Sequence, residues 1–303
     1  MSRMKLWRAL LAMAFAVAVL ALAACGDDDD DDDGGAGGGG DQAAEAEQFP
    51  ANTTLGKIQE RGEITIGVKY DVPPFGFENP QTNEVEGFDV DMGRFIAEEL
   101  GVEPKFVEAI SDNRIPFLER GTVDLILSTM TINAERDMEI DFSEPYYIAR
   151  GRILVPGDSD IKGLEDLAGG TSVCTALGST YEETIREEAP DAELRLVDTY
   201  SECLELLQNG AIDAISTDDV ILTGMIIQDD TLQMVGDPLT TEPYGVGIKD
   251  GDKQLKDFVD GVLQNAEEDG RWEETYQKWV GRHIGREEQP PDMTLQEALE
   301  LGT

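Results

Sequence analysis

The chain has 303 residues, of which 40% are hydrophobic, and this length suits about two domains with cores of their own. It carries 23 lysines and arginines against 64 aspartates and glutamates, a formal net charge of -41. Such an acidic surface repels phosphate, which argues against nucleic acid and against docking on anionic lipid through a basic patch. The one histidine, His283, argues against a histidine triad or a multi-histidine metal site. We expect no metal, no cofactor, and a surface position for His283.

The chain begins with an export signal. Basic residues at positions 3, 5 and 8 precede an apolar run over 9–24, the build of a secretory signal peptide. A transmembrane anchor is the alternative, but the run falls short of the roughly 20 residues that span a bilayer. The run ends in Leu22-Ala23-Ala24-Cys25, which resembles the bacterial lipobox. We therefore predict a lipoprotein signal peptide over 1–25, with lipid on Cys25 as the only membrane attachment and an extracytoplasmic location on the outer face of the cytoplasmic membrane.

An acidic and glycine-rich segment follows. Seven consecutive aspartates occupy 27–33, and glycine dominates up to residue 40. Like charges repel and glycine resists ordering, so we predict a disordered tether over 26–49. Calcium binding is the alternative for the aspartate run, but a flexible polyanion lacks the rigid ligand cage of calcium sites.

From residue 55 onward, short apolar runs alternate with helical patterns. The first series predicts strands at 63–68, 104–107 and 123–127 and helices at 88–100 and 114–120. The second series predicts strands at 171–174, 194–197 and 211–216 and helices from 180 and over 201–209. Strands that alternate with helices imply mainly parallel sheets covered on both faces.

The C-terminal part returns to helices, predicted at 255–268 and 272–280. Trp272, Tyr276 and Trp279 fall on one helix face, where we expect core packing and no ligand cage. The tail after residue 285 contains two adjacent prolines, and we expect it to be loosely held.

Polar residues follow four of the predicted strands. The four loops read Lys69-Tyr70-Asp71, Ser128-Thr129-Met130-Thr131, Leu177-Gly178-Ser179-Thr180 and Thr217-Asp218. Ligands of open α/β sheets bind at the carboxyl ends of the strands. Hydroxyl and charged side chains at those ends indicate a small polar zwitterion as ligand.

Two cysteines remain if Cys25 carries lipid. An even pair in an exported protein, here Cys174 and Cys203, suggests a disulfide. Two buried free thiols are the alternative.

Three motifs occur in order along the chain. They are Pro74-Phe75 with Gly87-Phe88-Asp89-Val90-Asp91-Met92, then Thr131-Ile132-Asn133-Ala134-Glu135-Arg136 with Asp141-Phe142-Ser143-Glu144-Pro145-Tyr146-Tyr147, and Asp213-Ala214-Ile215-Ser216-Thr217-Asp218. Over about residues 55–282 the chain resembles extracellular solute-binding proteins of the polar amino acid ABC transporter type. The Lys69-Tyr70-Asp71 loop, the surroundings of both cysteines and the run over 244–249 are most similar to the glutamate-binding branch, which is thought to bridge its matching cysteines.

The resemblance implies an α/β fold of the periplasmic-binding-protein-like type II, in which two lobes are joined by two hinge strands. Lobe 1 would comprise 50–146 and 243–282, lobe 2 would comprise 147–242, and 283–303 would form a tail. The ligand would lie in the cleft and favour the closed state by touching both lobes.

The resemblance also assigns ligand-binding roles. Arg136 would bind the ligand carboxylate bidentately, and Thr131 would donate its hydroxyl to that carboxylate with the Thr129 backbone nearby. Asp218 would accept the ligand ammonium. The predicted ligand-binding residues of lobe 2 are Gly178, Ser179, Thr180, Thr217 and Asp218. The backbone N–H groups of residues 179 and 180 favour an anion. The alternative role for these two residues is ordinary helix capping. For Arg136 the alternative is a surface ion pair with a neighbouring acid.

The chemistry of the ligand side chain is predicted from two positions at which this chain differs from many relatives. Many relatives place two aromatics around it, where this chain has Val72 and Ser111. Lys69 and Arg114 fall near the pocket instead, and two extra cations favour glutamate, then aspartate, then glutamine. The alternative for both cations is a solvated position. Phe75 either lines the pocket or packs inside the lobe.

The predicted function is that of a monomeric receptor that captures an acidic or polar amino acid and delivers it to an ABC permease. One alternative is a sensor domain for a membrane signalling partner. The other is a dehydratase-like enzyme on the same fold, which would need a general acid or base in the cleft. The one carboxylate predicted there, Asp218, is already assigned to the ammonium.

Overall fold

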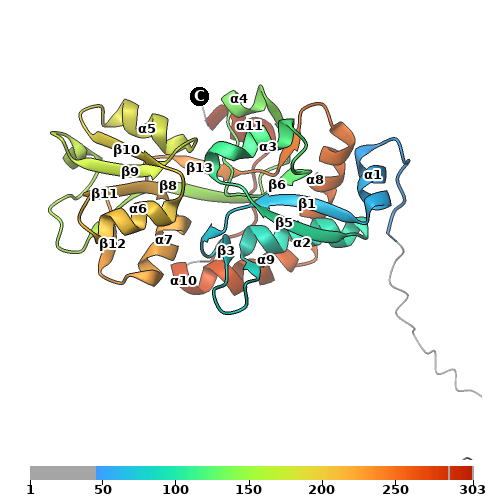
Figure 1. Ribbon diagram of the computed structural model, residues 1–303, viewed down its shortest axis with the longest axis horizontal. Helices are drawn as coiled ribbons and strands as arrows, with labels where there is room; N and C mark the ends of the chain where they lie inside the picture. The colour runs from blue at the N-terminus through green and yellow to red at the C-terminus, as the bar shows by residue number, and fades with distance from the viewer. Residues whose placement is uncertain (1–45, 286, 302–303) are drawn as a thin grey trace, which may run out of the picture. The chain divides into compact units, whose positions relative to one another are not determined.

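The computed structural model describes residues 46–285 and 287–301. The predicted signal peptide, Cys25 and the tether up to residue 45 lie outside these residues. The described chain forms two α/β lobes that lie side by side (Figure 1). Among residues 46–285 and 287–301, no helix has the length and apolar character needed to span a bilayer.

Lobe 1 is built on a five-stranded sheet in the order β5-β1-β6-β14-β7. Its strands are β1 Glu63–Val68, β5 Glu103–Glu108, β6 Leu125–Ile126, β7 Ile140–Phe142 and β14 Gly247–Lys249. Its main helices are α1 Thr54–Arg61, α2 Phe88–Leu100, α3 Arg114–Glu119, α4 Ala134–Asp137, α8 Lys253–Glu268 and α9 Arg271–Tyr276. Three short strands, β2 Asp71–Val72, β3 Gly76–Glu78 and β4 Val85–Glu86, form a separate sheet. Successive strand residues alternate between two cores, so that Leu125 faces the core of α2 and α8 while Ile126 faces the core of α3.

Lobe 2 is built on a second sheet in the order β10-β9-β11-β8-β12. Its strands are β8 Tyr147–Pro156, β9 Ser172–Ala176, β10 Glu193–Val197, β11 Ala214–Asp218, β12 Leu232–Val235 and β13 Thr241–Tyr244. Its helices are α5 Thr180–Glu188, α6 Tyr200–Gln208 and α7 Asp219–Gln228. One-turn helices complete the chain at Ser111–Asn113, Leu164–Leu167, Gln277–Gly281 and α10 Arg282–Ile284.

Two antiparallel strands connect the lobes. The first residues of the long strand β8 pair with β13, from Tyr147 opposite Tyr244 to Arg150 opposite Thr241. The remaining residues of β8 pair with β11 and β12 inside lobe 2. The fold is therefore the predicted two-lobed arrangement with two hinge strands. Both sheets are mixed, whereas the sequence predicted mainly parallel sheets, because the strands that return through the hinge run antiparallel to their neighbours.

Strand β11 differs from its predicted bounds. It covers Ala214–Asp218, because its last residues pair with β8 up to Asp218 opposite Gly151. The sequence placed the strand at 211–216, with Asp218 in a loop. The sheet therefore fixes the backbone of Asp218, and helix α7 begins at the next residue.

The aromatic face near the C-terminus packs in the core, as predicted. Trp272 stacks on Tyr276 with ring centroids 5.3 Å apart, and its Nε1 donates to the Tyr146 carbonyl at 2.8 Å. The predicted helix over 272–280 is interrupted, since α9 ends at Tyr276 and continues as a single π turn. His283 is exposed, as predicted.

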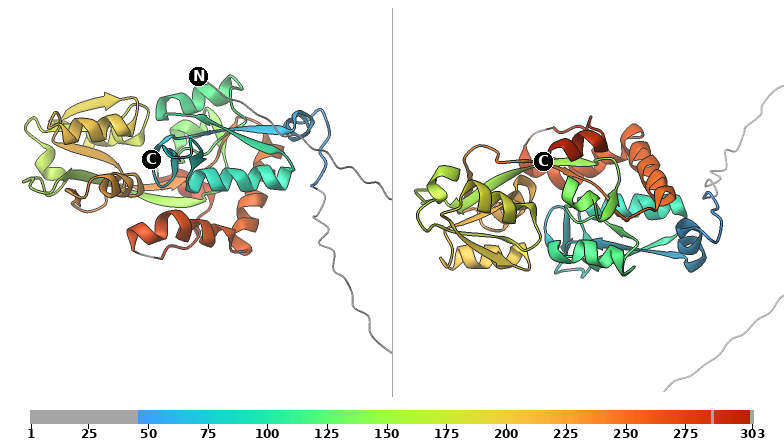
Figure 2. Two further views of the ribbon diagram at one scale, coloured as in Figure 1. Left: turned by 60° about the horizontal axis from the view of Figure 1, so that its bottom comes forward. Right: turned by 90° about the horizontal axis from the view of Figure 1, so that it is seen from above.

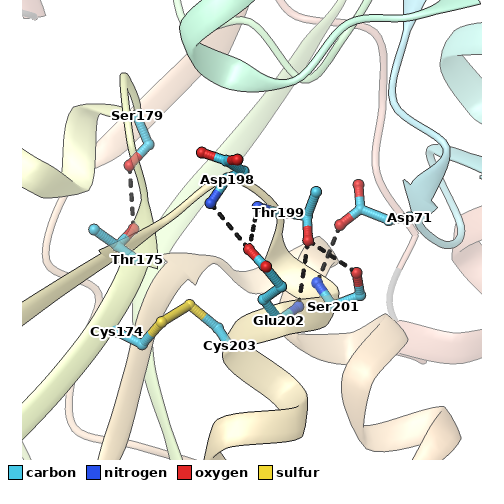
Figure 3. Close-up of a disulfide and its surroundings, with 9 residues drawn as sticks. All are labelled: Asp71, Cys174, Thr175, Ser179, Asp198, Thr199, Ser201, Glu202 and Cys203. Atoms are coloured by element: carbon cyan, nitrogen blue, oxygen red, sulfur yellow. Dashed lines mark hydrogen bonds between the residues drawn. A yellow bond between two sulfur atoms is a disulfide. The ribbon is translucent and has the colours of Figure 1, made fainter.

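Cys174 in β9 and Cys203 in α6 form a disulfide, which rules out the free-thiol alternative (Figure 3). The bond closes a loop across 29 positions of sequence. On the chain-entropy account, a loop of this size contributes about 3–4 kcal/mol to the free energy of unfolding. It joins the interior strand β9 of the lobe 2 sheet to helix α6.

The prediction of a loosely held tail is wrong for residues 287–301. Helix α11, Leu295–Leu301, lies against lobe 1 (dark red in Figure 2). Ala298 is fully buried beside Leu118 and Phe142, and the Leu295 N–H donates to Glu144 at 2.6 Å. The preceding helix α10 already ends with its C-cap at Gly285, and the two prolines lie in the segment between α10 and α11. An amphipathic turn beyond them supplies the apolar contacts that hold the tail.

The tail contact is tested by Ala298→Asp, which buries an unpaired charge. We expect the free energy of unfolding to fall by roughly 1–3 kcal/mol. Gln296→Asp, on the exposed side of the same helix, is the matched control and should change stability little. Urea unfolding of both variants measures the difference, and equal stabilities would mean that α11 does not pack on lobe 1.

Candidate functional site

A small cavity lies between the two lobes. Lobe 1 lines it with Ser111, Arg114, Thr129, Thr131 and Arg136. Lobe 2 lines it with Ser179, Thr180, Tyr181, Tyr200 and Asp218. Seven predicted site residues thus come together at this cavity.

Arg136 enters the cavity from the first turn of α4. The Asn133 side chain caps that helix by accepting the Arg136 N–H at 2.9 Å. The guanidinium is buried and donates to the Thr131 carbonyl at 2.7 Å and to the Gly178 carbonyl at 3.1 Å. The alternative of a surface ion pair is therefore wrong. The side chain spans from its own lobe to the loop before α5 in the other lobe.

Arg114 lies beside it and is only 2% exposed, so the alternative of a solvated helix residue is wrong. Its guanidinium donates to four backbone carbonyls, those of Ser111, Ser128, Thr129 and Gly178, at 3.0–3.1 Å. Burial, followed by the charge of Arg136, lowers its pKa to about 9. Burial also lowers the pKa of Arg136. Two desolvated guanidinium groups therefore face one cavity, an arrangement that favours an anion between them.

Lys69 follows β1 directly and is 3% exposed, which excludes the solvated alternative for this side chain too. Its Nζ donates to the Ser111 hydroxyl at 2.9 Å and lies 5.8 Å from the Tyr200 ring centroid. Burial, followed by the charge of Arg114, lowers its pKa to about 7. Lys69 does not itself line the cavity, but its partner Ser111 does.

Asp89 supports the loop after β6. This carboxylate lies in the first turn of α2 and accepts the Thr129 N–H at 2.8 Å and the Tyr146 hydroxyl at 2.7 Å. Thr129 has a positive φ of 43°, a strained conformation that this hydrogen bond holds in place. Burial raises the pKa of Asp89 to about 7, against the effect of those two hydrogen bonds. The sequence did not identify this supporting role.

Asp218 is the buried carboxylate of lobe 2 that lines the cavity. It accepts the Tyr181 hydroxyl at 2.9 Å. Burial, followed by the charge of Glu242, raises its pKa to about 8. A cationic group of a ligand would reverse this shift by stabilising the ionised carboxylate.

Glu242 on hinge strand β13 was missed by the sequence analysis. It is 3% exposed, and its Oε2 accepts hydroxyl protons from Thr131 at 2.6 Å and from Thr180 at 3.0 Å. Its charge also acts on both Arg136 and Asp218. No spacing pattern distinguishes this glutamate from the many others, because its importance comes from the pairing of β13 with β8.

Four predicted ligand-binding residues do not line the cavity. Phe75 packs inside lobe 1 against Phe88 and Tyr147, with ring centroids 5.2 and 4.9 Å away. Thr217 is buried within β11, and Lys69 acts through Ser111 as described. Gly178 contributes its carbonyl to both cavity arginines. Tyr181 and Tyr200 line the cavity although the sequence analysis did not assign them there.

The two lobes touch around the cavity. A Cβ atom on Gly178 would lie 2.8 Å from Asp112 Cα in the opposite lobe. The Ser201 N–H at the start of α6 donates to Asp71 of lobe 1 at 3.0 Å (Figure 3). The cleft is therefore closed. Within the described part of the chain, no group of three or more His, Cys, Asp or Glu side chains is arranged to hold a metal ion.

Comparison with known proteins gives concordant matches. The chain is 39% identical to the ABC transporter glutamine-binding protein GlnH of Bacillus subtilis, over 89% of this chain and 96% of that protein. It is 34% identical to the glutamate-binding protein GluB of Corynebacterium efficiens, over 76% of this chain and 81% of that protein. Its fold matches a variant of ArgBP from T. maritima with a TM-score of 0.71 and 31% identity, over 75% of this chain and 99% of that one.

The family model for bacterial extracellular solute-binding proteins, family 3, matches residues 64–282. This match covers both sheets, the two hinge strands and every residue that lines the cavity. The chain belongs to the bacterial extracellular solute-binding proteins, family 3.

Proposed function

We propose that this protein captures glutamate or glutamine in the interlobe cavity and delivers it to an ABC permease. The observation that carries the proposal is the pairing of two buried guanidinium groups with the buried carboxylate of Asp218 around a small closed cavity. An α-amino acid offers its carboxylate to the guanidinium groups and its ammonium to Asp218. The relatives named above are transport binding proteins for this class of ligand and are not enzymes.

The side chain of the ligand decides between the two amino acids. Lys69 and Arg114 favour a second carboxylate on the ligand, so glutamate is the first candidate. Glutamine comes next, since Arg114 already donates four hydrogen bonds to carbonyls and Glu242 adds a negative charge near the cavity. Aspartate is the third candidate, because its shorter side chain reaches less far toward Ser111 and Lys69.

Closure of the hinge would couple capture to delivery. A ligand that touches Arg136 in lobe 1 and Asp218 in lobe 2 stabilises the closed state, and a permease that accepts only this state distinguishes loaded from empty receptor. We also propose that Cys25 carries the lipid anchor, that the lobes have the predicted boundaries, and that the receptor acts as a monomer on the outer face of the membrane.

The ligand is tested by calorimetric titration of residues 45–303 with the twenty amino acids, after unfolding and refolding to remove bound ligand. We expect a dissociation constant on the order of 1 μM for glutamate or glutamine. Arg136→Ala should weaken binding by roughly 10- to 150-fold, the value of a hydrogen bond to a charged group. Arg186→Ala, on the exposed side of α5, is the matched control and should bind normally. Near-normal affinity in Arg136→Ala would contradict the site.

Closure is tested by Gly178→Ala. The residue has φ +74°, and the added Cβ would collide with backbone of the opposite lobe. Gly169 has φ +79° with nothing within 4 Å of a Cβ, so Gly169→Ala carries the same backbone strain without the collision. We expect only Gly178→Ala to enlarge the radius of gyration in small-angle scattering and to weaken ligand binding. Similar behaviour of both variants would argue against closure at this point.

The pH dependence distinguishes glutamate from glutamine. The ligand ammonium requires ionised Asp218, whose pKa is about 8 beside Glu242 and Asp219, so affinity should rise as pH increases toward 8. Glutamate also requires protonated Lys69, whose pKa is about 7 among Arg114, Asp71, Asp218 and Asp89. Above pH 7 this lysine loses its proton, which lowers the affinity for glutamate. Between about pH 7 and 8 we therefore expect rising affinity for glutamine and a flat profile for glutamate. Calorimetry in buffers of different ionisation heat measures the protons exchanged, and parallel profiles would contradict the role of Lys69.

A further inference from the structure

Two hydroxyl groups that line the cavity share one acceptor. Thr131 in lobe 1 and Thr180 in lobe 2 both hydrogen-bond to Oε2 of Glu242, at 2.6 and 3.0 Å. The three residues come from the loop after β6, the first turn of α5 and hinge strand β13. The contact therefore joins both lobes and the hinge.

The direction of these hydrogen bonds follows from the chemistry of the groups. An ionised carboxylate only accepts hydrogen bonds, and a hydroxyl has one proton and two lone pairs. Thr131 and Thr180 therefore give their single protons to Glu242 and turn lone pairs toward the cavity. Glu242 is a charged acceptor like a ligand carboxylate and already holds both protons, so a ligand gains little by recapturing them.

This orientation changes what the two threonines can bind. The family resemblance implies that Thr131 donates its hydroxyl to the ligand carboxylate, but that proton is already committed to Glu242. With their lone pairs exposed, both hydroxyls accept from N–H donors, as does the carboxylate of Asp218, which also lines the cavity. The guanidinium donors of the cavity, Arg114 and Arg136, remain for the carboxylate.

We propose that Glu242 is a positioning residue that makes the cavity select ligands with an ammonium group. By holding the protons of two hydroxyls, it turns both into acceptors and excludes isosteric ligands that carry a hydroxyl in place of the ammonium. The proposal rests on the proposed function. Because one hydroxyl comes from each lobe, the selection is complete only in the closed cleft.

The test compares two ligands of the same shape, L-glutamate and (S)-2-hydroxyglutarate, by calorimetric titration or competition. In Glu242→Gln the amide N–H groups can donate to the threonine hydroxyls, which frees their protons for the cavity. We expect the preference for glutamate over its hydroxy analogue to fall by at least about tenfold. A purely structural role of Glu242 would weaken both ligands by the same factor, and an unchanged preference would overturn the proposal.

The matched control is Asp91→Asn. Asp91 is a buried carboxylate of lobe 1 that accepts from Lys278 and Trp279 at 2.7 and 2.6 Å and does not line the cavity. This variant loses a buried charged partner as Glu242→Gln does, so we expect it to lose stability and to keep the ligand preference. A changed preference in the control would show that lost stability alone explains the effect.

A second measurement depends on no ligand and no Glu242 variant. In wild-type protein without ligand, proton NMR should show two threonine hydroxyl protons that exchange slowly with water, one missing in Thr131→Val and the other in Thr180→Val. Rapid exchange of both would overturn the role of Glu242 even if glutamate binds. Slow exchange together with no binding of any amino acid would overturn the proposed function instead.

Discussion

The closed cleft depends on keeping several charged groups out of water, and each group needs compensation where it is buried. Burying an ionised side chain without partners costs far more than one ion pair returns, so hydrogen bonds must satisfy it. Backbone carbonyls satisfy Arg114, and hydroxyls satisfy Asp218 and Glu242. The buried charged side chains therefore fix the backbone conformation of the loops that surround the cavity. The carbonyls of residues 128 and 129 point at Arg114 because Asp89 holds the Thr129 N–H on the other side.

The Gly178 carbonyl explains how closure and capture compete for the same donors. It accepts from both Arg114 and Arg136 across the cleft, so the closed arrangement has contacts without any ligand. A ligand carboxylate carries a full charge and bonds a guanidinium more strongly than a neutral carbonyl does. Such a ligand would take one of these donors while its ammonium binds Asp218 in the opposite lobe. The gain from the ligand would then be the difference between the two sets of contacts, which is smaller than the ligand contacts alone.

The sequence predicted the parts of the structure that depend on local patterns. Apolar spacing placed α2 at Phe88–Leu100, and the family motifs located the cavity residues Arg136 and Asp218. What it missed depends on contacts between distant segments. Glu242 matters because a hinge strand brings it to Thr131, 111 positions away in the chain. The tail packs because Ala298 meets an apolar surface assembled from several elements of lobe 1, which no local reading of its prolines could reveal.

The strong negative charge of the whole chain does not prevent the cleft from binding an acidic ligand. Charges on the exposed surface act through water and salt, which screen them beyond about 8 Å at physiological ionic strength. The guanidinium groups of Arg114 and Arg136 lie in a desolvated cavity, where screening is weak and a bound carboxylate would be in direct contact with them. The net charge of -41 therefore governs solubility and the approach of a ligand, while the few buried cations govern its binding. Overall acidity and the proposed preference for an anionic amino acid are compatible because they operate over different distances.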